Sequence, residues 1–84
     1  MIKIYTMPTC KYCNELKERL KTDNIEYEEI NIMLPENEAE YTKLCEITKS
    51  EQVPIVLVGK QLLVPEISFK TISEAAELTK KFLN

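Results

Sequence analysis

The stretch that decides the fold runs from Ile2 to Cys13 and reads Ile-Lys-Ile-Tyr-Thr-Met-Pro-Thr-Cys-Lys-Tyr-Cys. Residues 2–6 alternate and are rich in β-forming side chains, which predicts a strand. Residues 7–9 contain a proline and end it, and from Cys10 to about Asp23 the apolar spacing becomes helical. A strand, a short break and a helix that opens on two cysteines three residues apart are typical of a redox Cys-x-x-Cys motif.

The rest of the chain continues this alternation of strands and helices. Residues 25–32 predict a second strand, and a second helix opens at Leu34-Pro35, with a stripe formed by Tyr41, Leu44, Cys45 and Thr48. Residues 53–58 form a continuous β-branched run that predicts a buried strand. A turn at Gly59-Lys60 then returns the chain as a hairpin over residues 61–64.

The last element is a helix that begins after Thr71. Thr71 and Glu74 have the spacing of a capping box, in which two side chains satisfy the first amides of a helix. One face of this helix carries Ile72, Ala75, Ala76, Thr79, Phe82 and Leu83. The resulting order, β-α-β-α-β-β-α, predicts an α/β fold with a four-stranded mixed sheet flanked by three helices. A β-α-β start usually joins parallel strands, and the hairpin after Gly59 adds an antiparallel strand.

Length and composition favour one small domain over residues 1–84, with a radius of gyration of about 12 Å and monomer as the default state. The net charge of −3 argues against a nucleic-acid partner. No apolar run approaches the ~20 residues of a membrane span, and the N-terminus is too polar for a signal peptide. The absence of His excludes Ser-His triads, and a single glycine excludes phosphate-binding loops. Three cysteines without a signal peptide predict a reducing, cytoplasmic setting.

The cysteine pair predicts thiol–disulfide chemistry. Cys10 lies where a helix N-terminus presents unpaired amides and a positive dipole end, which stabilise a thiolate, and Lys11 adds a cation. We therefore interpret Cys10 as the nucleophile and Cys13, one turn deeper, as the resolving thiol. Lys17 is expected to face elsewhere. Half of a zinc site is the structural alternative, but Cys45 alone does not complete it.

Two further features leave alternatives open. Cys45 is predicted to be a small core residue, because free cysteines are often buried. Val53-Pro54 heads a buried strand, and this bond is read either as a simple strand start or as a cis bond that presents Val53 to an extended ligand.

The sequence resembles the glutaredoxins, within the thioredoxin fold. The resemblance rests on residues 4–6 leading into Thr9-Cys10-Lys11-Tyr12-Cys13, on Val53-Pro54 before a β-rich run, and on Gly59. It implies a glutathione-dependent reductase of protein disulfides and glutathione mixed disulfides, with glutathione as co-substrate and no metal. It also implies that Tyr12 borders the glutathione site, that Pro54 is cis and that Val53 pairs with the tripeptide. Ribonucleotide reductase is a possible protein substrate by family analogy alone.

Some family features are absent. Lys11 stands where the family usually has Pro, and Met7 replaces a basic residue that often contacts glutathione. The usual Gly-Gly and Asp are missing from residues 64–71, where Thr71, Ser73 or Glu66 are the candidates to hold the charged end of the ligand. These differences keep one alternative in view, a glutaredoxin-like electron donor to ribonucleotide reductase that is recharged by thioredoxin reductase. A further alternative is a non-enzymatic iron–sulfur carrier like the monothiol members of the family, but those usually have Ser where Cys13 stands, so Cys13 argues against it.

Overall fold

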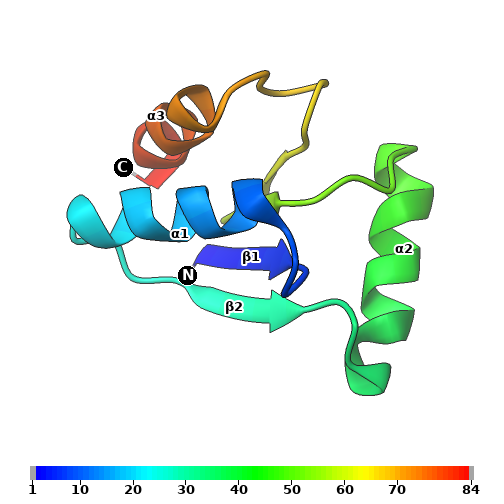
Figure 1. Ribbon diagram of the computed structural model, residues 1–84. Helices are drawn as coiled ribbons and strands as arrows, with labels where there is room; N and C mark the ends of the chain where they lie inside the picture. Colours follow the sequence, from blue (N-terminus) through cyan, green and yellow to red (C-terminus); the bar gives the residue numbers. More distant parts are fainter. Residues whose placement is uncertain (1, 84) are drawn as a thin grey trace.

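The computed structural model describes residues 2–83, and the chain follows the predicted order of strands and helices (Figure 1). The elements are β1 (Ile2–Thr6), α1 (Lys11–Thr22), β2 (Glu28–Asn31), the 3-10 turn η1 (Pro35–Asn37), α2 (Glu38–Thr48), β3 (Ile55–Val58), β4 (Gln61–Leu63) and α3 (Ile72–Leu83). The radius of gyration is 11.7 Å, as expected for a chain of this length.

The four strands form one mixed sheet in the order β2-β1-β3-β4. β1 and β2 are parallel and are joined through α1, whereas β3 is antiparallel to both β1 and β4. Gly59 lies in the β3–β4 turn with a φ of +60°, a left-handed conformation that glycine adopts without a steric penalty. The mixed thioredoxin-like sheet predicted from the sequence is therefore confirmed.

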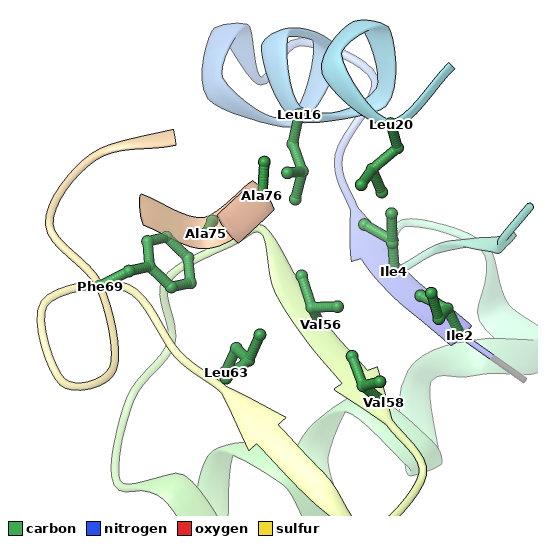
Figure 2. Packing of buried hydrophobic residues seen from close by; sticks show 10 residues of the cluster. All are labelled: Ile2, Ile4, Leu16, Leu20, Val56, Val58, Leu63, Phe69, Ala75 and Ala76. Atoms are coloured by element: carbon green, nitrogen blue, oxygen red, sulfur yellow. The ribbon is translucent and has the colours of Figure 1, made fainter. Parts of the chain in front are cut away.

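Each face of the sheet carries its own hydrophobic cluster, because alternate residues of a strand point to opposite faces. On β1, Ile4 faces the α1 and α3 side, whereas the next residue, Tyr5, belongs to the cluster with Leu44 of α2. Figure 2 shows the larger cluster, which consists of Ile2, Ile4, Leu16, Leu20, Val56, Val58, Leu63, Phe69, Ala75 and Ala76. This packing fixes α1, and with it the cysteine pair, over the centre of the sheet.

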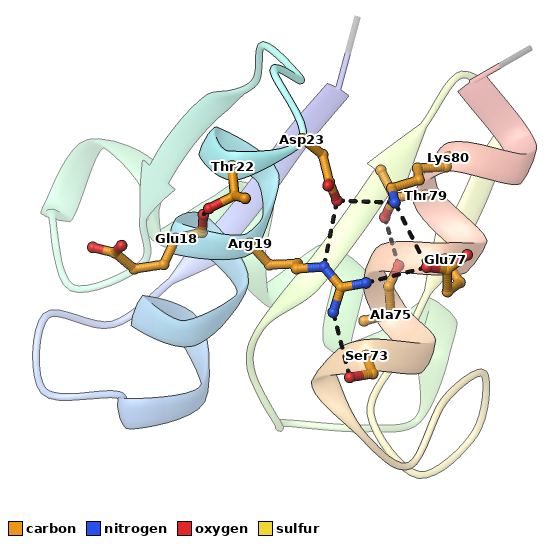
Figure 3. Close-up of polar contacts among 9 residues, drawn as sticks. All are labelled: Glu18, Arg19, Thr22, Asp23, Ser73, Ala75, Glu77, Thr79 and Lys80. Atoms are coloured by element: carbon orange, nitrogen blue, oxygen red, sulfur yellow. Dashed lines mark hydrogen bonds and ion pairs between the residues drawn. The ribbon is translucent and has the colours of Figure 1, made fainter.

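A polar network on the surface joins α1 to α3 (Figure 3). Arg19 contacts Glu77 at 3.2 Å and Asp23 at 3.4 Å, and Lys80 contacts Asp23 at 3.0 Å. Single exposed ion pairs contribute about 0–1 kcal/mol, so packing dominates and the network sets the orientation of the two helices.

Two expectations for element bounds and one for burial are wrong. β2 begins at Glu28 and not at residue 25, although Ile25 still packs against the larger cluster. The segment that opens at Pro35 starts as a 3-10 turn before α2 begins. Near the end of α3, Phe82 and Leu83 are exposed, so the predicted apolar face of this helix is buried at Ala75, Ala76 and Thr79 and not at its last turn.

Candidate active site

Cys10 is the N-cap residue of α1. Its backbone is extended, with φ −84° and ψ 114°, and its Sγ accepts a hydrogen bond of 3.1 Å from the backbone N–H of Cys13. The preceding turn is closed by the N–H of Cys10, which donates to the carbonyl of Met7 at 3.1 Å. The first turn of α1 holds no acidic residue, so the positive end of the helix dipole acts on the Cys10 sulfur without competition. The half-buried Cys10 sulfur therefore lies at the positive end of α1.

Cys13 differs from Cys10 in its surroundings. Its exposed fraction is 0%, and it packs one turn deeper in α1. Burial, aided by the hydrogen bond with Cys10, raises the pKa of the Cys13 thiol to about 12. At neutral pH Cys13 is thus a protonated thiol beside Cys10. This asymmetry suits a nucleophile followed by a resolving thiol.

A groove of about 510 Å³ opens beside the cysteine pair, which is within the range of about 300–1,000 Å³ of small-molecule sites. Tyr12 forms one wall with a side chain that is 61% exposed, and Val53, Pro54 and Thr71 line the groove as well. Four residues predicted from the sequence to bind the ligand therefore line one hollow.

The Val53-Pro54 bond is cis, as the family resemblance implied. Val53, beside this cis bond, lines the groove. The family resemblance assigns it pairing with the backbone of an extended ligand.

Lys11 lies elsewhere. Its side chain lines a second, more open hollow with Pro8, Thr9 and Asn14, and it does not line the groove of Tyr12. The two residues between the cysteines therefore point to different surfaces, because successive residues of a helix are about 100° apart.

The segment 64–71 is a compact turn that forms the far wall of the groove. The carbonyl of Val64 accepts hydrogen bonds from Ile67 at 3.2 Å and from Ser68 at 2.8 Å. Glu66 takes a left-handed φ of 69°, and its N–H donates to the carbonyl of Phe69 at 2.8 Å. Phe69 is 5% exposed within the larger core cluster. Phe69 therefore anchors the turn in the core while it also lines the groove.

Thr71 completes the predicted capping box. Its hydroxyl accepts a hydrogen bond of 3.1 Å from the N–H of Glu74, and the Glu74 carboxylate accepts in return from the N–H groups of Thr71 and Lys70. Thr71 therefore holds the start of α3 while it lines the groove.

The groove contains residues that sequence reasoning did not single out as ligand contacts. They are Glu15, Gln52, Pro65, Lys70 and Ile72. Gln52 and Lys70 each precede a predicted site residue directly, and this adjacency is the signal that could have found them. Two carboxylates, on Glu15 and Glu66, and one ammonium, on Lys70, give the groove an acidic balance.

Cys45 is half-buried on α2 and belongs to neither hydrophobic cluster. It lines a separate surface hollow, so the expectation of a core cysteine is wrong. Its neighbour Tyr41 donates a hydrogen bond of 2.5 Å to the carbonyl of Glu51, which lies in the loop before β3. Leu44 takes the buried position of α2 instead.

Residues 2–83 hold neither an evident metal-binding cluster nor a membrane-spanning helix. No cluster of three or more His, Cys, Asp or Glu side chains is placed there to hold a metal ion. No helix of this part of the chain has the length and apolar character needed to cross a bilayer.

Together, the thioredoxin-like sheet and the cysteine pair at a helix N-terminus define a redox protein of the thioredoxin superfamily. A family model of the glutaredoxins matches residues 2–63. An uncharacterised glutaredoxin-like 8.6 kDa protein of the rubredoxin operon of Clostridium pasteurianum is 34% identical over 64 residues, which are 76% of this chain and 83% of the relative. The chain belongs to the glutaredoxin family.

Solved structures agree with this fold. A buckwheat glutaredoxin in complex with glutathione superposes with a TM-score of 0.73 at 17% identity, over 98% of this chain and 70% of that one. A mutant thioredoxin-like protein matches along the whole of both chains, with a TM-score of 0.71 and 25% identity. The glutaredoxin-like NrdH-redoxin of Escherichia coli has a TM-score of 0.60 at 24% identity, over 73% of this chain and 76% of that one.

Proposed function

We propose that this protein is a glutathione-dependent thiol–disulfide oxidoreductase that reduces protein disulfides and glutathione mixed disulfides through Cys10 and Cys13. Glutathione is the co-substrate, and the reaction uses no metal. The observation that supports this most directly is the groove of Tyr12, Val53, Pro54 and Thr71 beside the N-cap cysteine. A dithiol of this kind works in a reducing compartment, and we propose the cytoplasm.

The reaction follows from the difference between the two thiols. The Cys10 thiolate attacks one sulfur of the substrate disulfide, a new Cys10–substrate bond forms, and the second substrate sulfur leaves with the electron pair and takes a proton. Either Cys13 or glutathione then attacks the Cys10 sulfur and releases the first substrate thiol. Two glutathione molecules return the Cys10–Cys13 disulfide to the dithiol and become glutathione disulfide.

A second candidate function is electron donation to ribonucleotide reductase with recharging by thioredoxin reductase. The similarity to NrdH-redoxin, which has a thioredoxin-like activity profile, favours it. So does the acidic balance of the groove, because glutathione is itself an anion. The presence of Tyr12 and the lack of Trp favour the glutathione-dependent function.

A two-arm turnover assay separates these functions. A small glutathione mixed disulfide is supplied with glutathione, glutathione reductase and NADPH, and a protein disulfide is supplied in parallel with thioredoxin reductase and NADPH. We expect turnover in the glutathione arm. Turnover in the thioredoxin reductase arm alone puts the second candidate in first place, and turnover in neither arm overturns both. Cys10→Ser is the background control in each arm.

A further inference from the structure

A polar cluster outside the groove joins three elements next to Cys13. It consists of Thr6 at the end of β1, Glu29 on β2 and Lys17 on α1. One carboxylate oxygen of Glu29 accepts 2.8 Å hydrogen bonds from the Thr6 hydroxyl and from the Lys17 ammonium. Thr6 is 1% exposed, so the cluster is anchored in the interior of the fold. The groove and the substrate chemistry described above leave this cluster without a role.

The Lys17 end of the cluster lies one helical turn from the resolving cysteine. Cys13 and Lys17 are four residues apart in α1, which places them on one face of the helix with their Cβ atoms about 5–6 Å apart. The strand that carries Thr6 leads into Met7, whose backbone forms a hydrogen bond with the Cys13 sulfur. The expectation that Lys17 faces away from the motif is therefore wrong.

The charges of the cluster act on Cys13. The Lys17 ammonium lowers the pKa of Cys13 against the larger effect of burial. The hydrogen bond with Lys17 lowers the pKa of Glu29, and the same bond raises the pKa of Lys17, so both partners are charged at neutral pH. The other titratable groups that face the cluster are Cys10, Tyr27 and Lys21.

We propose that Lys17 is a positioning residue that stabilises the Cys13 thiolate during the resolving step, and that Glu29, held by Thr6, limits how much of this charge reaches Cys13. The proposal deepens the proposed function and rests on it. In the step, the Cys13 thiol loses its proton to solvent and its sulfur attacks the Cys10 sulfur of the mixed disulfide. The Cys10–Cys13 bond forms, and the substrate sulfur leaves with the electron pair and takes a proton from solvent.

Coulomb's law gives the order of magnitude of the effect. A unit charge at a separation of about 6 Å, comparable to the spacing of the two Cβ atoms, changes an ionisation equilibrium about threefold in the dielectric of bulk water, and a lower dielectric enlarges this change. Loss of the Lys17 charge should therefore slow the resolving step about threefold or more. Loss of the Glu29 charge should accelerate it, because the ammonium then acts on Cys13 without a counter-charge.

A stopped-flow experiment with an aromatic disulfide reagent measures this step alone. In a Cys45→Ser background, less than one equivalent of dithiobis-nitrobenzoate reacts with the reduced protein. Attack by Cys10 releases a first coloured thiolate, and attack by Cys13 releases the second in a unimolecular phase. Cys13→Ser must abolish the second phase. No glutathione is needed, so failure of the proposed function and failure of this inference are distinguishable.

Lys17→Gln and Glu29→Gln must change the second phase in opposite directions. We expect Lys17→Gln to slow it and to shift its pH profile upward by about half a pH unit or more, Glu29→Gln to accelerate it, and Lys17→Arg to restore it. The first phase should stay unchanged, as should both phases of Lys43→Gln, a matched loss of charge on α2. If both variants slow the second phase, or neither changes it, the cluster is structural and the proposal is overturned. Glu29→Gln keeps the shape of the side chain. It therefore tests the direction of the change in the rate of the second phase even where Lys17→Gln folds poorly.

Discussion

Lys11 and Tyr12 are adjacent in the chain, yet their side chains line different hollows on either side of the start of α1. Tyr12 stands in the groove with Val53 and Pro54, whereas Lys11 faces the hollow of Pro8. The two residues between the cysteines therefore divide two tasks. We expect Tyr12 to border the ligand and Lys11 to add positive charge next to Cys10.

Replacing Lys11 should change the redox potential more than glutathione use. Glutaredoxins lie at roughly −200 to −230 mV and thioredoxin near −270 mV, and we expect this protein at the glutaredoxin end or less negative. Lys11→Gln removes a charge that favours the thiolate, and thus the reduced form, so the redox potential should become more negative. The change should be about 10 mV for each half kcal/mol by which the substitution destabilises the reduced form relative to the oxidised form. Equilibration in glutathione redox buffers measures it. A wild-type potential near that of thioredoxin contradicts the expectation.

Replacing Cys10 and replacing Cys13 should have different effects on activity. Cys10→Ser should abolish all turnover, because the nucleophile is lost. Cys13→Ser should keep the monothiol reaction with glutathione mixed disulfides and lose the reduction of protein disulfides that needs a resolving thiol. The coupled glutathione reductase assay and an insulin reduction assay measure the two reactions. Dithiol-type activity that persists in Cys10→Ser would contradict the roles assigned here.

Alkaline pH should destabilise the reduced protein through Cys13. Folding raises the pKa of this thiol from 9.0 to about 12, so between these values the folded state holds a proton that the unfolded state has lost. The contribution of Cys13 to stability is therefore complete below pH 9 and is lost as the pH rises, by up to about 1.4 kcal/mol per pH unit. Urea unfolding of wild type and Cys13→Ser at a series of pH values measures the difference. Tyr5 and Tyr41 titrate in both proteins and cancel, and equal slopes for the two proteins would show that the thiol carries no such shift.

The cysteine pair of the site could be predicted from the sequence, because the signals that indicate it are local. The proline break, the cysteine spacing and the helical pattern after Cys10 determine where the nucleophile lies. The capping box at Thr71 is equally local, since both partners lie within one turn. The start of β2 was missed because Ile25 alternates like a strand residue and packs in the core without joining the ladder.

The remaining parts depend on contacts between distant segments. The hydrogen bond from Thr6 to Glu29 joins β1 to β2, and no local sequence pattern indicates it. The turn at residues 64–71 is held by Phe69 in the core and by the left-handed backbone of Glu66, a conformation more usual for glycine. The side-chain direction of Lys11 depends on the phase of α1 relative to the groove, which the sequence alone does not supply.

Thr71 should matter for stability through its hydroxyl. Thr71→Ala removes the acceptor for the N–H of Glu74 and should cost about 1 kcal/mol of unfolding free energy, whereas Thr71→Ser keeps the cap and should cost much less. Urea unfolding measures both variants. A similar loss for the two would mean that the methyl group, and not the capping hydrogen bond, stabilises the start of α3.

The charges at the groove should tune the use of glutathione. Glutathione carries a net negative charge, so Glu66→Gln should lower its KM and Lys70→Gln should raise it, each by about two- to fivefold, the effect of an exposed charge pair of roughly 0.4–1 kcal/mol. Both effects should shrink at high salt, because exposed charges are screened. Steady-state kinetics at low and high ionic strength measure them, and Glu36→Gln in η1, outside the groove, is the matched control. If Glu66→Gln raises KM instead, the Glu66 carboxylate contacts the amino group of glutathione, and the acidic wall would then be the part of the groove that binds the charged end of the tripeptide.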